Sequence, residues 1–181
     1  MLGAIIGDII GSRFEWHNHR SKDFELFTNR CFATDDSIMT LAAAKAIIES
    51  KKDLTALGTA AVAIFMARTG KSIDEIREYI EAHYYKIDFT LDEIRDTYKF
   101  NESCQNTVPQ ALEAFFESTG FEDAIRNAIS IGGDSDTLAA ITGGMAQACY
   151  GIPENIRKSA LGFLDETQRG ILDEFECIYM K

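Results

Sequence analysis

Proline and positive charge are both scarce in this sequence. Only two prolines occur in 181 residues, and no low-complexity run marks a linker. Lysine and arginine total 18 against 29 acidic residues, which gives a formal net charge of −11. Because nucleic-acid-binding surfaces are basic, this balance argues against a nucleic-acid partner. We therefore expect one domain spanning residues 1–181, with a core of ordinary size.

Paired cysteines and membrane-spanning runs are also missing. No C-x-x-C pair occurs, so the cysteines are expected to be reduced thiols of a cytosolic protein and not zinc ligands. The apolar start, residues 1–10, is too short to span a bilayer. It has no basic leader and contains Asp8, so it does not resemble a signal peptide. The sequence predicts a cytoplasmic protein with no membrane partner.

Apolar residues recur at helical spacing along the sequence, and no segment alternates convincingly with the period of two expected of a strand. Two stripes illustrate this spacing: Leu2, Ile5, Ile6 and Ile9 in the first segment, and Ile38, Leu41, Ala44 and Ile48 in a later one. Both stripes are expected to face the core. The pattern predicts an all-α fold of about nine helices.

Three expectations concern single helices. A helix that is apolar nearly all round is expected from residue 54 to residue 68. Another is expected to begin around Pro109, because proline is favoured in the first helical turn. The last helix is expected to turn Leu172 and Ile178 towards the core.

Three glycines lie on one face of the first predicted helix. Gly3, Gly7 and Gly11 are spaced four residues apart, and each costs about 1 kcal/mol relative to alanine in a helix. We therefore expect another backbone or a ligand to approach this face closely. Asp8, which lies in the same apolar run, is interpreted as a helix residue whose carboxylate finds a local donor.

The sharpest chemical signal is an acidic turn before a long apolar run. Asp134, Asp136 and Thr137 follow two glycines and precede an apolar helix at residues 138–150. Such a helix is expected to be buried, and a buried carboxylate is costly without a positive partner. No lysine or arginine lies nearby in the sequence. A bound cation is therefore a natural partner.

A second acidic turn opens another apolar helix. Thr34, Asp35 and Asp36 again supply one threonine and two aspartates at a helix start. Taken alone, either turn is an ordinary helix cap that complements the helix dipole. Together they offer a set of hard oxygen ligands, which suits Mg²⁺, Mn²⁺ or Ca²⁺. Four carboxylates could hold two ions, so the residues indicate a metal-dependent hydrolase of unstated substrate.

These motifs resemble those of the ADP-ribosylglycohydrolase family. Residues 3–8 with 12–15 are similar to the family's opening helix and its glutamate, and residues 34–37 are similar to its first metal motif. Residues 104–112 resemble the helix before the second motif, and residues 132–151 resemble that motif and its helix. The two metal motifs together are far more specific than either one alone.

The resemblance implies an orthogonal all-α bundle with two Mg²⁺ or Mn²⁺ ions. It also implies hydrolysis of the N- or O-glycosidic bond between ADP-ribose and a modified protein side chain or small molecule. By motif match, one ion would be bound by Thr34, Asp35 and Asp36, and the other by Asp134, Asp136 and Thr137, with Asp136 shared. The implied catalytic residues are Asp134, Glu15 and Asp35: Glu15 would lie beside the ribose, and Asp134 would activate water.

The sequence also departs from the family. Members are typically much longer and carry a segment between the two metal motifs that helps to form the substrate cleft. Here Ser50 is followed within a few residues by the next apolar helix. Two alternatives therefore stay open: a module that binds metal and ADP-ribose without catalysis, and a remnant whose acidic turns are only caps. The shortened chain would also leave apolar surface uncovered, which favours a homo-oligomer.

Overall fold

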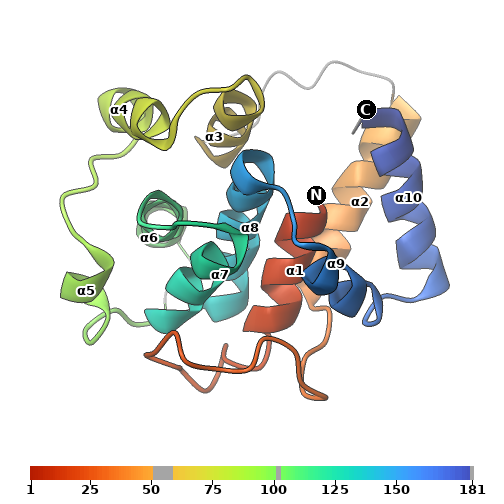
Figure 1. Cartoon of the computed structure of the whole chain (residues 1–181), viewed down its shortest axis with the longest axis horizontal. Helices are drawn as coiled ribbons and strands as arrows, with labels where there is room; N and C mark the ends of the chain where they lie inside the picture. The colour runs from red at the N-terminus through yellow and green to blue at the C-terminus, as the bar shows by residue number, and fades with distance from the viewer. Residues whose placement is uncertain (51–58, 101–102, 180–181) are drawn as a thin grey trace.

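A computed structural model describes residues 1–50, 59–100 and 103–179 of the chain (Figure 1). These residues form ten α-helices and no β-strand, which confirms the all-α prediction with one helix more than the expected nine. In chain order the helices are α1 (Leu2–Gly11), α2 (Asp35–Ser50), α3 (Thr59–Arg68), α4 (Ile73–His83), α5 (Leu91–Ile94), α6 (Cys104–Phe116), α7 (Phe121–Ser130), α8 (Ser135–Tyr150), α9 (Glu154–Leu161) and α10 (Glu166–Tyr179).

Helix α1 lies at the centre of the molecule. Nine of its ten residues are buried, and it packs against α8 more extensively than any other described pair of helices does. Helices α3, α6 and α7 also pack on α8, while α2 packs on α1 and is covered in turn by α10 (Figure 1). The core therefore follows the α1–α8 pair, and the remaining helices surround that pair.

The glycine face of α1 lies directly on the backbone of α8. A Cβ atom added to Gly3 or Gly7 would fall inside van der Waals contact of the carbonyl oxygens of Gly143 and Ala139. At Gly11 the added atom would lie 2.5 Å from the Cα of Asp136. These contacts confirm the predicted close approach of another backbone. They also fix α1 and α8 side by side at the positions that carry acidic residues.

Helix α6 begins earlier than the proline suggests. It starts at Cys104, so that Pro109 lies inside the helix and not in its first turn. The proline removes a hydrogen bond that would otherwise reach the carbonyl of Gln105, an exposed residue one turn earlier. Water can bond to that carbonyl, so the helix tolerates the proline here. The expected helix over residues 54–68 is described only from Thr59, since residues 51–58 lie outside the described part of the chain.

Two predicted core residues are exposed. Ile38 is 55% exposed, although Leu41 and Ala44 of the same stripe are buried. The inward position of the first turn belongs to Ser37, which is fully buried four residues before Leu41. Ile178 is 48% exposed near the end of α10, whose main described neighbour is α2. The prediction was wrong at both positions; Ile48 lies among residues whose side chains are not described.

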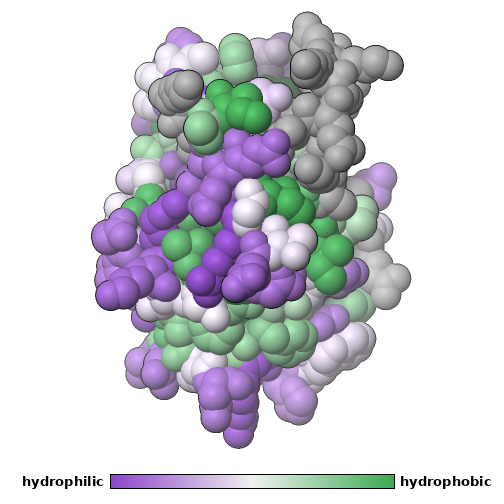
Figure 2. Space-filling model, turned by 90° about the vertical axis from the view of Figure 1, so that its right-hand side faces the viewer, coloured by the Kyte–Doolittle hydropathy of each residue, from purple (hydrophilic) through white to green (hydrophobic). Residues whose placement is uncertain are grey.

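The side of the molecule that carries α2 and α10 shows apolar patches among hydrophilic ones (Figure 2). Exposed apolar side chains are common on soluble proteins, and the expected homo-oligomer stays a prediction. Across the three described stretches, no helix is both long enough and apolar enough to cross a bilayer.

Candidate metal centre

The acidic turn that opens α8 is shaped by its own glycines. Gly132 and Gly133 have φ angles of +71° and +77°, which an L side chain rarely adopts. The backbone N–H of Gly133 donates to the side-chain oxygen of Asn18 at 3.0 Å, which ties this turn to the loop after α1. The chain then enters α8 with Asp134 as its N-cap residue and Asp136 in its first turn. Asp134 is half-buried and Asp136 is only 4% exposed.

The acidic turn that opens α2 is held by a residue of another helix. Asp8 of α1 is fully buried, and its carboxylate accepts the backbone N–H groups of Thr34 at 2.9 Å and Ser37 at 3.1 Å. The hydroxyl groups of both residues donate to the same carboxylate. Asp8 therefore caps α2 from a distance. The sequence led us to expect a donor close to Asp8 in the chain. The observed donors instead lie 26 and 29 residues away.

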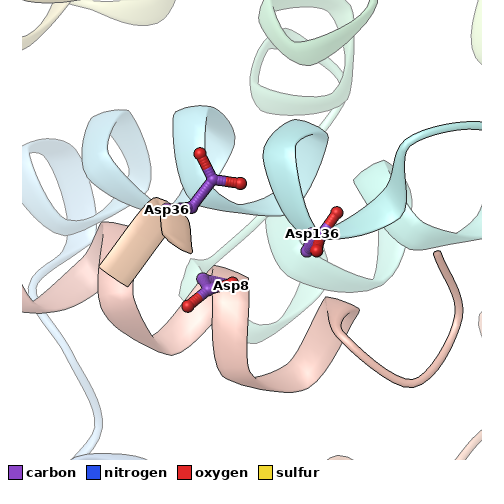
Figure 3. A group of neighbouring side chains, drawn as sticks. All are labelled: Asp8, Asp36 and Asp136. Carbon is purple, nitrogen blue, oxygen red and sulfur yellow. The ribbon is translucent and has the colours of Figure 1, made fainter. Parts of the chain in front are cut away.

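The two turns meet beside α1. Carboxylate oxygens of Asp8, Asp36 and Asp136 lie within 4.8 Å of one another (Figure 3). Oxygens of Glu15, Asp134 and Asp136 form a second group of the same dimensions. Asp136 belongs to both groups. Three helices and the loop after α1 therefore bring five carboxylates to one place, with Asp136 at the junction.

The threonines expected at the site both bond to carboxylates within it. The Thr137 hydroxyl donates to Asp36 at 2.9 Å and so links α8 to α2 across 101 residues. The Thr34 hydroxyl donates to Asp8. Asp35 differs from the other candidates: it is exposed and belongs to neither acidic group found among the described residues. The metal-binding and catalytic roles of all these residues stay predictions.

Sequence reasoning did not include Asp8 in the site. Its signal was present, because an aspartate inside an apolar helix needs partners if it is buried. Its partners could not be read from the sequence, since they come from the start of another helix. Ser37 was also missed for the same reason, although it follows the two aspartates of its turn directly.

The site has a strong excess of negative charge. Burial, followed by the neighbouring Asp134, raises the pKa of Asp136 to about 7. Burial also raises the pKa values of Asp36, Asp134 and Glu15, and the charges of neighbouring carboxylates add to it. No lysine or arginine is among the main influences on the pKa of these four groups. Clustered, half-buried carboxylates without a basic partner fit a divalent cation, and an all-oxygen donor set suits Mg²⁺ or Mn²⁺.

The sequence was also compared with known proteins. Residues 52–176, more than two thirds of the chain, match the model of a family described as ADP-ribosylglycohydrolase. This range contains the acidic turn of α8 and begins after the acidic turn of α2. No curated protein and no solved structure matches the chain.

Proposed function

Since the chain belongs to the ADP-ribosylglycohydrolase family, we propose that it hydrolyses the glycosidic bond between ADP-ribose and a modified side chain or small molecule. The observation that carries this proposal is the meeting of two acidic groups at Asp136. A pair of helix caps would have no need to converge, whereas the ions of a two-ion centre lie about 3.5–4 Å apart, so their ligands must come together. The remnant interpretation, in which both turns are only caps, is therefore the weaker one.

The carboxylates divide into two sets, each suited to one Mg²⁺ or Mn²⁺ ion. Asp36 and Asp136, with Thr34 beside them and Asp35 at the exposed rim, would hold the first. Asp134, Asp136 and Thr137 would hold the second, with Glu15 next to it. Asp8 is assigned a positioning role, because its carboxylate already accepts four hydrogen bonds from Thr34 and Ser37.

When bound, such ions supply positive charge that orients the ribose hydroxyls and lowers the pKa of water. The protein's own groups then have three tasks. Asp134, whose carboxylate bonds to the side chains of Asp136 and Thr137, would accept a proton from water. Glu15 lies on the loop after α1, where it can accept a hydrogen bond from a ribose hydroxyl. The surrounding carboxylates stabilise the positive charge that develops on the sugar as the bond breaks.

In the reaction, the oxygen of water bonds to C1 of the ribose and the bond from C1 to the leaving group breaks. Asp134 takes the proton that water loses and then releases it to the leaving group, so one water supplies the hydroxyl group on C1 and the hydrogen on the leaving group. Burial of Asp136 between the two sets keeps this arrangement fixed, because its neighbours come from α1, α2 and α8.

The proposal is tested by release of free ADP-ribose. Purified protein is incubated with arginine-linked and serine-linked ADP-ribosyl substrates in Mg²⁺ or Mn²⁺, with EDTA as the control. We expect release that depends on the metal and is lost in Asp136→Asn. If no substrate is cleaved while ADP-ribose still raises the melting temperature in Mg²⁺, the protein is a binding module and the hydrolase proposal is wrong.

A further inference from the structure

A second recess opens next to the acidic site and has the opposite character. It measures about 440 Å³, a size typical of pockets that hold small ligands. Its polar side chains include Arg13, His17 and Arg30, and none of its described lining residues is a carboxylate. The described lining is thus basic, aromatic and hydroxyl-bearing, in a chain whose formal net charge is −11. Such a site attracts anions, because a cleft concentrates the potential of the charges that line it.

Residues that line the recess are close neighbours in the chain of residues that form the acidic site. The Ser12 hydroxyl accepts the backbone N–H of Phe32 at 3.2 Å, and both residues line the recess. Asp8 lies one turn before Ser12 in α1, and Thr34 lies two residues after Phe32. The backbone N–H of Thr34 donates to the carboxylate of Asp8. Glu15 lies between Phe14 and Trp16, which also line the recess. The loop after α1 therefore contributes residues to both sites.

The two arginines of the recess are held differently. The Arg13 guanidinium donates to the Thr28 hydroxyl at 3.1 Å and to the carbonyl of Glu25, and lies 4.4 Å from the centre of the Phe14 ring. It is therefore a fixed positive charge in the wall. Arg30 is exposed, and within the described part of the chain its guanidinium has no hydrogen-bond or ion-pair partner. A planar guanidinium with unused donors matches the oxygens of a phosphate group.

Large aromatic side chains flank these arginines. Trp16 is 74% exposed, although one side of its ring stacks on Phe100 with 5.5 Å between the ring centres. Phe32 is 54% exposed on the other segment of the recess. Exposed aromatic rings beside arginines form a surface on which a nucleobase can stack while its phosphates are neutralised.

We propose that this recess binds the nucleoside diphosphate part of the substrate, with Arg30 and Arg13 on the phosphates and Trp16 or Phe32 against the base. The proposal rests on the proposed function in its choice of ligand. It divides recognition between two neighbouring sites of opposite charge. The acidic site receives the hydroxyl-bearing sugar, and the recess receives the anionic end.

The test is calorimetric binding of ADP in EDTA, so that metal at the acidic site cannot capture the phosphates. We expect ADP to bind the wild-type protein, and Arg30→Ala to weaken that binding about tenfold, the effect of losing one charge-assisted contact. Trp16→Ala or Phe32→Ala should weaken the binding of both ADP and adenosine, whereas Arg30→Ala should leave adenosine binding unchanged. Arg169→Ala, which removes an exposed arginine of α10 outside this recess, is the matched control. Thermal melting establishes that each variant is folded.

Two results would overturn the proposal: no binding of ADP to the wild-type protein, or equal binding to wild type and Arg30→Ala. Its failure can be separated from failure of the hydrolase assignment. If ADP-ribose is released and Arg30→Ala leaves KM unchanged, the recess is wrong and the hydrolase stands. If nothing is released but ADP binding depends on Arg30, the recess stands alone. If the hydrolase proposal and the recess proposal both hold, Arg30→Ala raises KM with little change in kcat, because Arg30 is not part of the reacting centre.

Discussion

The acidic turns that open α2 and α8 have the same composition but are built differently. Each supplies one threonine and two aspartates at the start of a helix. At α8, both Asp134 and Asp136 enter the shared acidic cluster. At α2, Asp36 enters it while Asp35 stays exposed. A short motif therefore does not fix how many of its carboxylates reach a site.

The difference comes from what orients each turn. The α8 turn is set locally, by two glycines with positive φ directly before it. The α2 turn is set from outside, by the carboxylate of Asp8 bonding to Thr34 and Ser37. The first arrangement starts from nearby residues, with Asn18 added as a bond to Gly133, whereas the second needs α1 to be in place. The variants below test this difference, beginning with the largest expected effect.

Asp136→Asn should have the largest effect on turnover. Asp136 is the one residue found in both acidic groups of the described structure, so its loss weakens both sets of ligands. A bound metal supplies several kcal/mol of charge stabilisation, so we expect a loss of about 1,000-fold or more in kcat. Release of ADP-ribose at saturating Mg²⁺ is the measurement. A smaller loss than in Asp36→Asn would show that Asp136 is not the junction of the site.

Asp8→Asn should affect both stability and metal affinity. An amide cannot accept the four donors that now bond to the carboxylate, and one buried donor left unpaired costs about 1–3 kcal/mol. Loss of a positioning group should also weaken metal binding by about 10–100-fold. Urea unfolding and metal titration measure the two effects. The control is Asp74→Asn in the exposed first turn of α4, which should change neither.

The pH dependence of the metal-free protein should reflect Asp136. Burial and Asp134 raise its folded-state pKa to about 7, above the unfolded value near 3.9. The folded state thus binds the proton more tightly than the unfolded state does, and protonation of Asp136 stabilises the fold. This contribution to the free energy of unfolding is complete below pH 3.9 and is lost as the pH rises through 7. We expect the melting temperature in EDTA to fall by several degrees between pH 6 and pH 8.

A second series of melting temperatures in saturating Mg²⁺ separates the contribution of Asp136 from that of other groups that titrate in this pH range. Burial also raises the pKa of Glu113 to about 7 despite its contact with Arg77, so part of the fall has another source. Glu113 lies outside the acidic groups at the metal site, and metal should not change its share. We therefore expect Mg²⁺ to reduce the fall without abolishing it. An equal fall in EDTA and in Mg²⁺ would contradict binding of metal at Asp136.

Of the four predicted effects, that of Asp35→Asn should be the smallest. Its carboxylate is exposed at the rim, although its charge still reaches Glu15 and Asp36. We expect metal affinity to fall by about tenfold, the low end for a group that supports a metal, with kcat nearly restored at saturating metal. Metal titrations of Asp35→Asn and Asp36→Asn compare the pair. Equal losses would mean that the two aspartates of this turn contribute alike.

The sequence predicted those features that depend on local pattern. Helical spacing led to the all-α fold, and the glycine stripe of α1 led to the close packing on α8. Both acidic turns were visible because their residues are adjacent in the chain. The family resemblance first suggested by these turns agrees with the matched range.

Rotation of a helix about its axis could not be predicted in the same way. The stripe of α2 was expected to include Ile38, but the bond from Ser37 to Asp8 turns Ser37 inwards and leaves Ile38 exposed. That bond joins residues 29 positions apart, and no local rule anticipates it. The position of Pro109 was misjudged because a preference for first turns does not forbid a place one turn later at an exposed end.

The burial of α1 against α8 has a consequence for synthesis of the protein on the ribosome. Helix α1 is made before α8, its main partner, which begins more than 120 residues later. At translation rates of about 5–20 residues per second, its apolar face waits on the order of ten seconds for that partner. The nascent chain thus carries a helix whose glycine face stays without its partner until α8 has been made. The same helix that fixes the finished site is therefore open to non-native contacts while the chain grows.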